Sequence, residues 1–330
     1  MILVTGGNGY VAGYVLKALG ALGALAKGGS AAGVRALVRN QAQFARFQSL
    51  NVQPVLGDVT NPESLTKAMA GVTQVVHLAA VNRDKGAVTM ERVNQQGTIN
   101  VVNAAKQAGT QHITNLVGLG ASPMKPYPLA QTQGIGVDYI VNSGVPYTIL
   151  EASVIFGAGD EFLNTLAGLA RIPPFMVVPG DGRSRFQPIA AQDVAACVVR
   201  SLSLTEVKNK RLQICGSEEL TLEEIIDAIL AEMKLGAHQD SHASAGFEGC
   251  GEPDGRVVAQ APGYAKPVGA VGCGQRSDGQ RDGESIWPQA TQAAREHWIC
   301  ARDDVGKADQ PHAGQSGISV RRMSRVSRMP

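Results

Sequence analysis

Short apolar runs alternate with helix-like segments along most of the first 235 residues. Asn61 followed by Pro62 marks a helix start, because proline suits a first helical turn, and residues 100–107 carry apolar positions before Gly109. Strands that alternate with helices of this length form βαβ units. The pattern predicts an α/β fold with a doubly wound parallel sheet. The predicted strands are residues 2–5, 34–39, 52–56, 74–78, 112–117 and 147–150.

A glycine-rich turn follows the first predicted strand directly. It has the spacing Gly6-x-x-Gly9-x-x-Ala12, and a helix is predicted to begin near Tyr10. Gly6 permits a tight turn, and Gly9 lets a pyrophosphate approach the backbone and the positive end of the helix. A structural strand-to-helix turn could use the same residues, but the βαβ pattern around it favours nucleotide binding.

The rhythm changes after residue 152. Helices are predicted over residues 161–171 and 191–203, and short strands over residues 175–178 and 212–215. Thr221 and Glu224 form a capping box for a helix that reaches Met233. We therefore expect a dinucleotide-binding core of residues 1–152 and a small C-terminal lobe of residues 153–235 that completes the domain.

Residues 236–330 differ in kind from the rest of the chain. They contain no leucine and no helical or alternating period, so they have little apolar surface to offset the entropy of ordering. This composition predicts a disordered tail. Trp287, Trp298 and three cysteines fit such a tail poorly, and a shifted reading frame in the gene is the alternative that the sequence leaves open.

Charge and cysteine content narrow the class of protein. A net charge of +2 gives no reason to expect nucleic acid as a partner, and five scattered cysteines without a C-x-x-C pair fit a reducing compartment. Lys17, Gly20 and Gly23 interrupt the apolar stretch near the start, so no transmembrane segment is expected. With the first strand beginning at Ile2, no signal peptide is expected either. We predict a cytoplasmic protein.

Three segments beyond residue 152 carry a family resemblance. They are residues 153–164, residues 185–189 and the run Asp193-Val194-Ala195. With the glycine turn, they make residues 1–233 resemble the atypical branch of the short-chain dehydrogenase/reductase superfamily. Within it the chain looks most like the dinucleotide-binding accessory subunits of respiratory complex I and their NmrA-like and epimerase-like relatives. Packing alone would also explain much of the three segments.

The resemblance implies a Rossmann-type fold, a bound dinucleotide and a respiratory or quinone-linked complex as partner, which would place the protein at the periphery of a membrane. Arg39 ends the second strand, where a cation favours the 2′-phosphate of NADP over the ribose hydroxyl of NAD. A solvated surface arginine is the alternative, so NAD stays open. The resemblance assigns cofactor contacts to Gly6, Gly9, Tyr10, Val11, Ala12, Arg39, Asp58, Val59, Leu78, Ala79, Ala80 and Asn94.

The catalytic positions of the superfamily are changed. Active members use a serine, a tyrosine that moves a proton, and a lysine four residues later that lowers the pKa of the tyrosine. These places hold Gly118, Leu129 and Gln133, and moving the alignment to Tyr127 puts Gln131 at the lysine place. We therefore assign no catalytic residue.

The sequence favours a cofactor-binding structural or redox-sensing component. The alternatives are an NAD(P)-dependent reductase or nucleotide-sugar epimerase that uses Tyr127 or water as its acid, and a redox-sensing regulator that binds proteins through its C-terminal lobe. His77 lies in an apolar strand and is interpreted as a core histidine. Four residues of the tail have metal-ligand chemistry but irregular spacing, so no metal site is predicted. These are Cys250, Cys273, His297 and Cys300.

Overall fold

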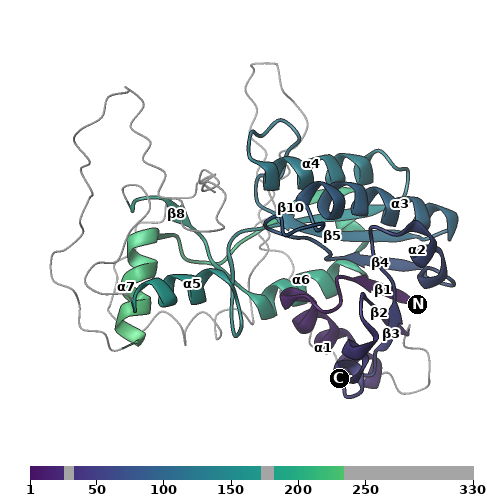
Figure 1. The fold of residues 1–330 in the computed structure, drawn as a ribbon, viewed down its shortest axis with the longest axis horizontal. Coiled ribbons are helices and arrows are strands. Elements are labelled where there is room, and N and C mark those ends of the chain that lie inside the picture. The colour runs from purple at the N-terminus through teal and green to yellow at the C-terminus, as the bar shows by residue number, and fades with distance from the viewer. Residues whose placement is uncertain (26–32, 172–181, 234–330) are drawn as a thin grey trace, which may run out of the picture.

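The computed structural model describes residues 1–25, 33–171 and 182–233. Its centre is a seven-stranded sheet in the order β10-β6-β5-β4-β1-β2-β3, and every pairing within it is parallel. The predicted α/β fold with a doubly wound parallel sheet is confirmed (Figure 1). The strands are β1 (Ile2–Thr5), β2 (Val34–Val38), β3 (Gln53–Leu56), β4 (Gln74–His77), β5 (His112–Gly118), β6 (Tyr147–Ala152) and β10 (Lys210–Ile214).

Helices cover both faces of the sheet, which explains why nearly all side chains of its central strands β1, β4 and β5 are buried. On one face, α1 (Tyr10–Leu25) packs beside α6 (Ala191–Ser201). On the other face lie α2 (Pro62–Ala68), α3 (Thr98–Gln107) and α4 (Pro128–Val141) (Figure 1). All four residues of β1 are buried between these two layers.

A small lobe lies beyond the carboxyl ends of the strands (Figure 1). Helices α5 (Phe162–Leu169) and α7 (Leu222–Glu232) pack together there, beside an antiparallel pair of β8 (Arg185–Phe186) with β11 (Leu220–Thr221). Strands β7 (Ile155–Phe156) and β9 (Ile189–Ala190) pair in parallel. The lobe has its own apolar core, and the predicted capping box at Thr221 is present in full.

Part of the segment after residue 152 returns to the sheet. Strand β10 pairs with β6 at the sheet edge, and α6 covers the α1 face, so the separate lobe is smaller than its predicted range. The boundary at residue 152 stays a prediction. The predicted strand at 175–178, the tail from 236 onward and the metal-type residues within it lie outside the described residues.

Several elements were not anticipated from the sequence. Helix α4 contains Gly134 and Gly136, which lower helix propensity. A Cβ at Gly134 would come within 2.2 Å of the Ser122 backbone, and one at Gly136 within 2.8 Å of the Asn94 carbonyl oxygen, so packing selects these glycines. Other segments that the sequence did not predict are the 3₁₀ helices η1 (Gln41–Phe47) and η3 (Thr205–Val207), the π-helical segment η2 (Glu91–Gly97) and the two-residue strands β7, β8, β9 and β11.

None of the helices in residues 1–25, 33–171 and 182–233 is long and apolar enough to cross a bilayer.

Candidate dinucleotide-binding site

The candidate site lies at the carboxyl edge of the sheet, where β1 has β4 on one side and β2 on the other. From β1 the chain proceeds to β2 and β3 on one side, and only later to β4 on the other side. The strand order therefore reverses at β1. In open parallel sheets, ligands bind in the crevice at such a reversal.

The glycine loop after β1 is held tightly between the neighbouring strands. Gly6 has a φ of +66°, and a Cβ there would lie 2.8 Å from the backbone nitrogen of Ala79. The Gly7 N–H donates to the Leu37 carbonyl at 3.0 Å, and the Gly9 N–H donates to the Gly6 carbonyl at 2.7 Å. The first glycine is required by both its backbone conformation and its surroundings.

Helix α1 starts at Tyr10, immediately after the loop. The first N–H groups of a helix have no partner within it, and Gly9 has no side chain to cap them. The first turn carries no acidic residue that would repel an anion. Exposed Gly9 and the N–H groups of Tyr10, Val11 and Ala12 thus fit a pyrophosphate, so the residues present suit a dinucleotide.

Two arginines lie near the loop. Arg39 directly follows β2, is exposed, and makes no hydrogen bond or ion pair within the described parts of the chain. The Arg46 guanidinium on η1 donates to the Asn8 side-chain oxygen at 2.7 Å and to the Asn8 carbonyl at 3.3 Å. Sequence reasoning missed Arg46, because its only signal was a basic residue after the second strand.

Asp58 and Val59 lie in the loop after β3. The Asp58 carboxylate accepts hydrogen bonds from the Thr60 N–H at 2.8 Å and from the Thr60 hydroxyl at 2.9 Å, so it closes a turn. Val59 is buried, and its side chain packs against Gly97. The part of the site next to β3 is therefore formed by a turn whose shape Asp58 fixes.

Leu78, Ala79 and Ala80 follow β4, and Asn94 braces the end of this segment. The Asn94 side chain is buried in η2, where its oxygen accepts from the Val81 N–H at 2.8 Å and its nitrogen donates to the Val81 carbonyl at 2.9 Å. An asparagine that pairs with both backbone polar groups of one residue fixes that residue in position and orientation.

The structure brings two of the aligned catalytic places together. Gly118 ends β5, and its N–H donates to the Gln133 side-chain oxygen at 3.0 Å. Leu129 and Tyr127 lie at the start of α4, where Tyr127 is the residue before the first turn. The Gln133 side chain, at the place of the lysine, is therefore hydrogen-bonded to the backbone of Gly118, at the place of the serine.

The first helix also contacts the segment that leads to the lobe. The Tyr14 hydroxyl donates to the Ala158 carbonyl at 3.1 Å, and the Tyr10 ring lies edge-on to Tyr14. Burial raises the pKa of Tyr10, followed by the influence of Tyr14 and Asp160, so the Tyr10 phenol stays protonated and is a poor general base.

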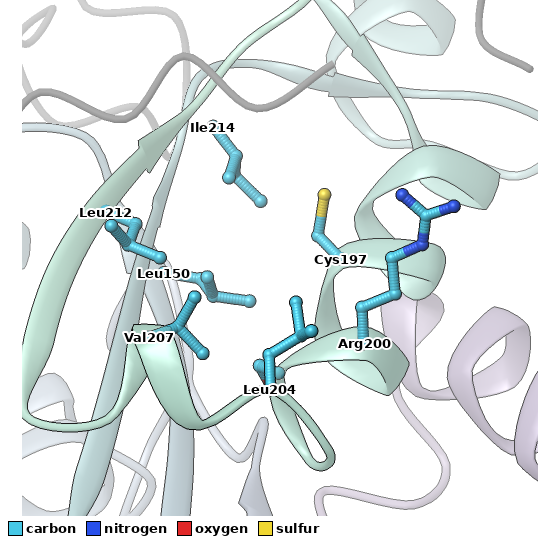
Figure 2. Close-up of a pocket in the computed structure, with 8 residues that line it drawn as sticks. Leu150, Cys197, Arg200, Leu204, Val207, Leu212 and Ile214 are labelled. Atoms are coloured by element: carbon cyan, nitrogen blue, oxygen red, sulfur yellow. The ribbon is translucent and has the colours of Figure 1, made fainter. Parts of the chain in front are cut away.

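A separate hollow of about 10 Å³ lies between α6 and strands β6 and β10, room for about one water molecule. Figure 2 shows its lining, in which Leu150 and Leu212 of the sheet face Cys197 of α6. Burial raises the pKa of the Cys197 thiol to about 11, so it is not a reactive thiolate at neutral pH. Among the described residues, no cluster of three His, Cys, Asp or Glu side chains could hold a metal ion.

The chain is similar in sequence to several named proteins. An NAD(P)H azoreductase of Xenophilus azovorans is 26% identical over 231 residues, 70% of this chain and 73% of that protein. The photosystem II assembly factor Ycf39 of a Synechocystis strain is 27% identical over 233 residues, 68% of this chain and 65% of that protein. Subunit 9 of the mitochondrial NADH dehydrogenase 1 alpha subcomplex of Dictyostelium discoideum is 21% identical, covering 60% and 57%.

Solved structures share the fold. An NADPH-dependent quinone oxidoreductase from Escherichia coli, complexed with NADPH, superposes with a TM-score of 0.58 at 23% identity, covering 71% of this chain and 76% of that one. A dTDP-glucose 4,6-dehydratase from Streptomyces venezuelae with NAD bound gives a TM-score of 0.60 at 21% identity, covering 71% and 81%.

A family described as NAD(P)H-binding matches residues 6–203, more than half of the chain. The match begins at the first glycine of the loop and extends through α6. The predicted family resemblance is confirmed, as is an NAD(P)-type cofactor. The chain belongs to the NAD(P)H-binding family.

Proposed function

We propose that this protein binds NADP(H) at the carboxyl edge of its sheet without the Ser/Tyr/Lys chemistry of a dehydrogenase. It serves as a cofactor-binding structural or redox-sensing component of a respiratory or quinone-linked complex. The hydrogen bond from the Gly118 N–H to the Gln133 side chain carries the proposal, because it joins a backbone group and a neutral amide at the places aligned with the catalytic serine and lysine.

The residues assigned as cofactor contacts have complementary roles in this proposal. The glycine loop and the first N–H groups of α1 bind the pyrophosphate, and Arg39 binds the 2′-phosphate. Val59 lies on the adenine side, and the Leu78–Ala80 segment lies along the cofactor. Asp58 fixes the loop after β3 and Asn94 fixes the loop after β4, and their hydrogen bonds to Thr60 and Val81 support these roles. Bound NADPH would supply a hydride.

Catalysis by the superfamily route needs a cation near the phenol. Gln133 is neutral at every pH, and its oxygen accepts the Gly118 N–H at 3.0 Å. Tyr127 has neither a lysine four residues later nor a serine opposite, since those places hold Gln131 and Gly118. Without that cation nothing at these places stabilises the phenolate that a proton transfer would leave, so the transfer is slow at neutral pH.

Partnership with a membrane-bound complex is supported by the relatives. One of them is named as a subunit of NADH dehydrogenase and another as a photosystem assembly factor. In such a setting a bound nucleotide stabilises the native state by mass action, and it would report the cellular NADPH pool to a partner.

A reductase is the second candidate, favoured by the azoreductase relative. Hydride acceptors with conjugated double bonds leave an anion that water can protonate, so they do not require a fixed phenol. This reaction would need only a bound cofactor and room above it. It would make the chain an enzyme in spite of Gly118 and Gln133.

Turnover assays with NADPH separate these alternatives. We expect no reduction of simple carbonyl compounds and no conversion of nucleotide sugars, whereas Tyr127→Phe should bind NADPH like the wild type. Carbonyl turnover that disappears in Tyr127→Phe would contradict the proposal. Turnover of a quinone or azo dye that survives in this variant would select the second candidate.

A further inference from the structure

Directly beneath the glycine loop lies a buried chain of polar side chains. His77, the last residue of β4, has its Nδ1 2.7 Å from the Thr5 hydroxyl at the end of β1. Its Nε2 lies 2.9 Å from the hydroxyl of Thr98, the first residue of α3. All three residues are at most 4% exposed, so water cannot replace any of these contacts.

The hydroxyl of Thr98 fixes the proton on one ring nitrogen. It lies 2.6 Å from the Asn94 carbonyl oxygen, which can only accept a hydrogen bond. The single hydroxyl hydrogen of Thr98 is therefore used there. It follows that the His77 Nε2 carries a hydrogen and donates it to Thr98.

The hydroxyl of Thr5 fixes the other ring nitrogen. Its oxygen accepts the N–H groups of Leu78 at 3.2 Å and of Ala79 at 3.3 Å, which occupy both lone pairs. A third donor would have no acceptor site, so Thr5 donates its own hydrogen to the unprotonated Nδ1 of His77. Every hydrogen in the chain then has an acceptor.

Both ends of this chain reach the same loop. At one end, Thr5 holds the N–H groups of Leu78 and Ala79. At the other end, Thr98 bonds to the backbone carbonyl of Asn94, whose side chain pairs with both the N–H and the carbonyl of Val81. We propose that His77, as the Nε2–H tautomer, is a positioning residue that fixes residues 78–81 for dinucleotide binding.

The position of this loop also sets the glycine loop. A Cβ on Gly6 would lie 2.8 Å from Ala79, so the two backbones are in direct contact. A shift of Ala79 would be transmitted to the pyrophosphate site. Burial lowers the pKa of His77 to about 4, consistent with a neutral ring at neutral pH.

The inference rests on the proposed NADP(H) binding, so it is tested in two arms. The first arm needs no ligand and uses ¹⁵N NMR of the full chain with labelled histidine. The signals of His77 are assigned from their absence in His77→Gln. If His77→Gln does not fold, they are assigned from their shift in Thr5→Val. We expect a protonated Nε2 and an unprotonated Nδ1. A protonated Nδ1 would overturn the proposal.

The second arm measures the Kd for NADPH by calorimetry. Thr5→Val keeps the shape of the side chain but removes both the donor to His77 and the acceptor for residues 78 and 79. We expect the Kd to rise about tenfold, which corresponds to about 1.4 kcal/mol. Thr114→Val is the matched control, since Thr114 is equally buried and bonds to Ser201 away from the carboxyl edge.

A merely structural role would lower the melting temperature of both variants and leave both Kd values within about twofold of the wild type. That outcome would overturn the proposal. If the wild-type chain itself fails to bind NADPH, the proposed function fails instead. The tautomer measurement then still decides which ring nitrogen of His77 carries the hydrogen.

Discussion

At the residue scale, the proposed function assigns the choice between NADP and NAD to a single side chain, that of Arg39. Arg39 is exposed at the end of β2 and has no partner among the described residues, so its charge is available to a ligand. The Arg46 guanidinium, in contrast, donates hydrogen bonds to Asn8 and thereby holds the glycine loop in shape. We therefore expect the two arginines to have separable roles, Arg39 in choosing the phosphate and Arg46 in holding the glycine loop.

Replacing Arg39 with aspartate should reverse the preference. Arg39→Asp removes the cation that pairs with a 2′-phosphate and supplies a carboxylate for the ribose hydroxyls. We expect NADPH affinity to fall at least tenfold, about 1.4 kcal/mol, while NADH affinity rises. Lys67→Asp makes the same charge change in the last turn of α2 and should leave both affinities unchanged. An unaltered preference in Arg39→Asp would refute the role.

At the scale of elements, sequence and structure agree wherever local patterns dominate. Pro62 predicts a helix start because proline suits a first helical turn, and in the structure the Asn61 side chain caps that helix by accepting the N–H groups of Glu63 and Ser64. Helix α4 was not predicted, because glycines lower helix propensity and the reason for them is not local. Gly134 packs against the backbone of Ser122 and Gly136 against that of Asn94, and both contacts form only in the folded chain. Tertiary contacts override propensity at such places.

Two glycine-to-alanine changes in helices should have opposite effects. Alanine normally stabilises a helix by up to about 1 kcal/mol over glycine. Gly168→Ala in α5, where a Cβ would meet no atom within 4 Å, should therefore raise the free energy of unfolding. Gly134→Ala should lower it by about 1–3 kcal/mol, since its Cβ would collide with the Ser122 backbone. Urea unfolding of both variants measures this, and equal effects would contradict the packing of α4.

At the scale of the whole molecule, the alternation of strands and helices predicts the doubly wound parallel sheet, but not its strand order or the return of β10 to the sheet beside β6. The hydrogen-bonded chain through His77 did not follow, because Thr5, His77 and Thr98 are brought together only by the pairing of β1 with β4 and the packing of α3. Sequence showed His77 as a core residue, and the structure confirms that it is buried and satisfied.

Buried neutral histidines make stability depend on pH. The pKa of His77 falls to about 4 by burial, against about 6.5 in the unfolded chain. Between these values the unfolded state binds more protons, so stability is complete above about pH 6.5 and is lost as the pH falls toward 4. From pH 7 to pH 5 we expect a loss of about 2 kcal/mol from His77 in chemical denaturation. A loss equally steep in His77→Gln would show that other groups cause it.

The central claim is that NADP(H) binds where the glycine loop meets β4. Calorimetric titration of the full chain with NADPH and NADH tests it most directly, with Gly6→Ala and Gly71→Ala as a matched pair. Both glycines have nearly the same φ, +66° and +68°, but only at Gly6 would a Cβ meet the neighbouring loop. We predict that wild type and Gly71→Ala bind NADPH more tightly than NADH, whereas Gly6→Ala loses binding. Absence of NADPH binding to the wild type, or equal binding by Gly6→Ala, would contradict the account.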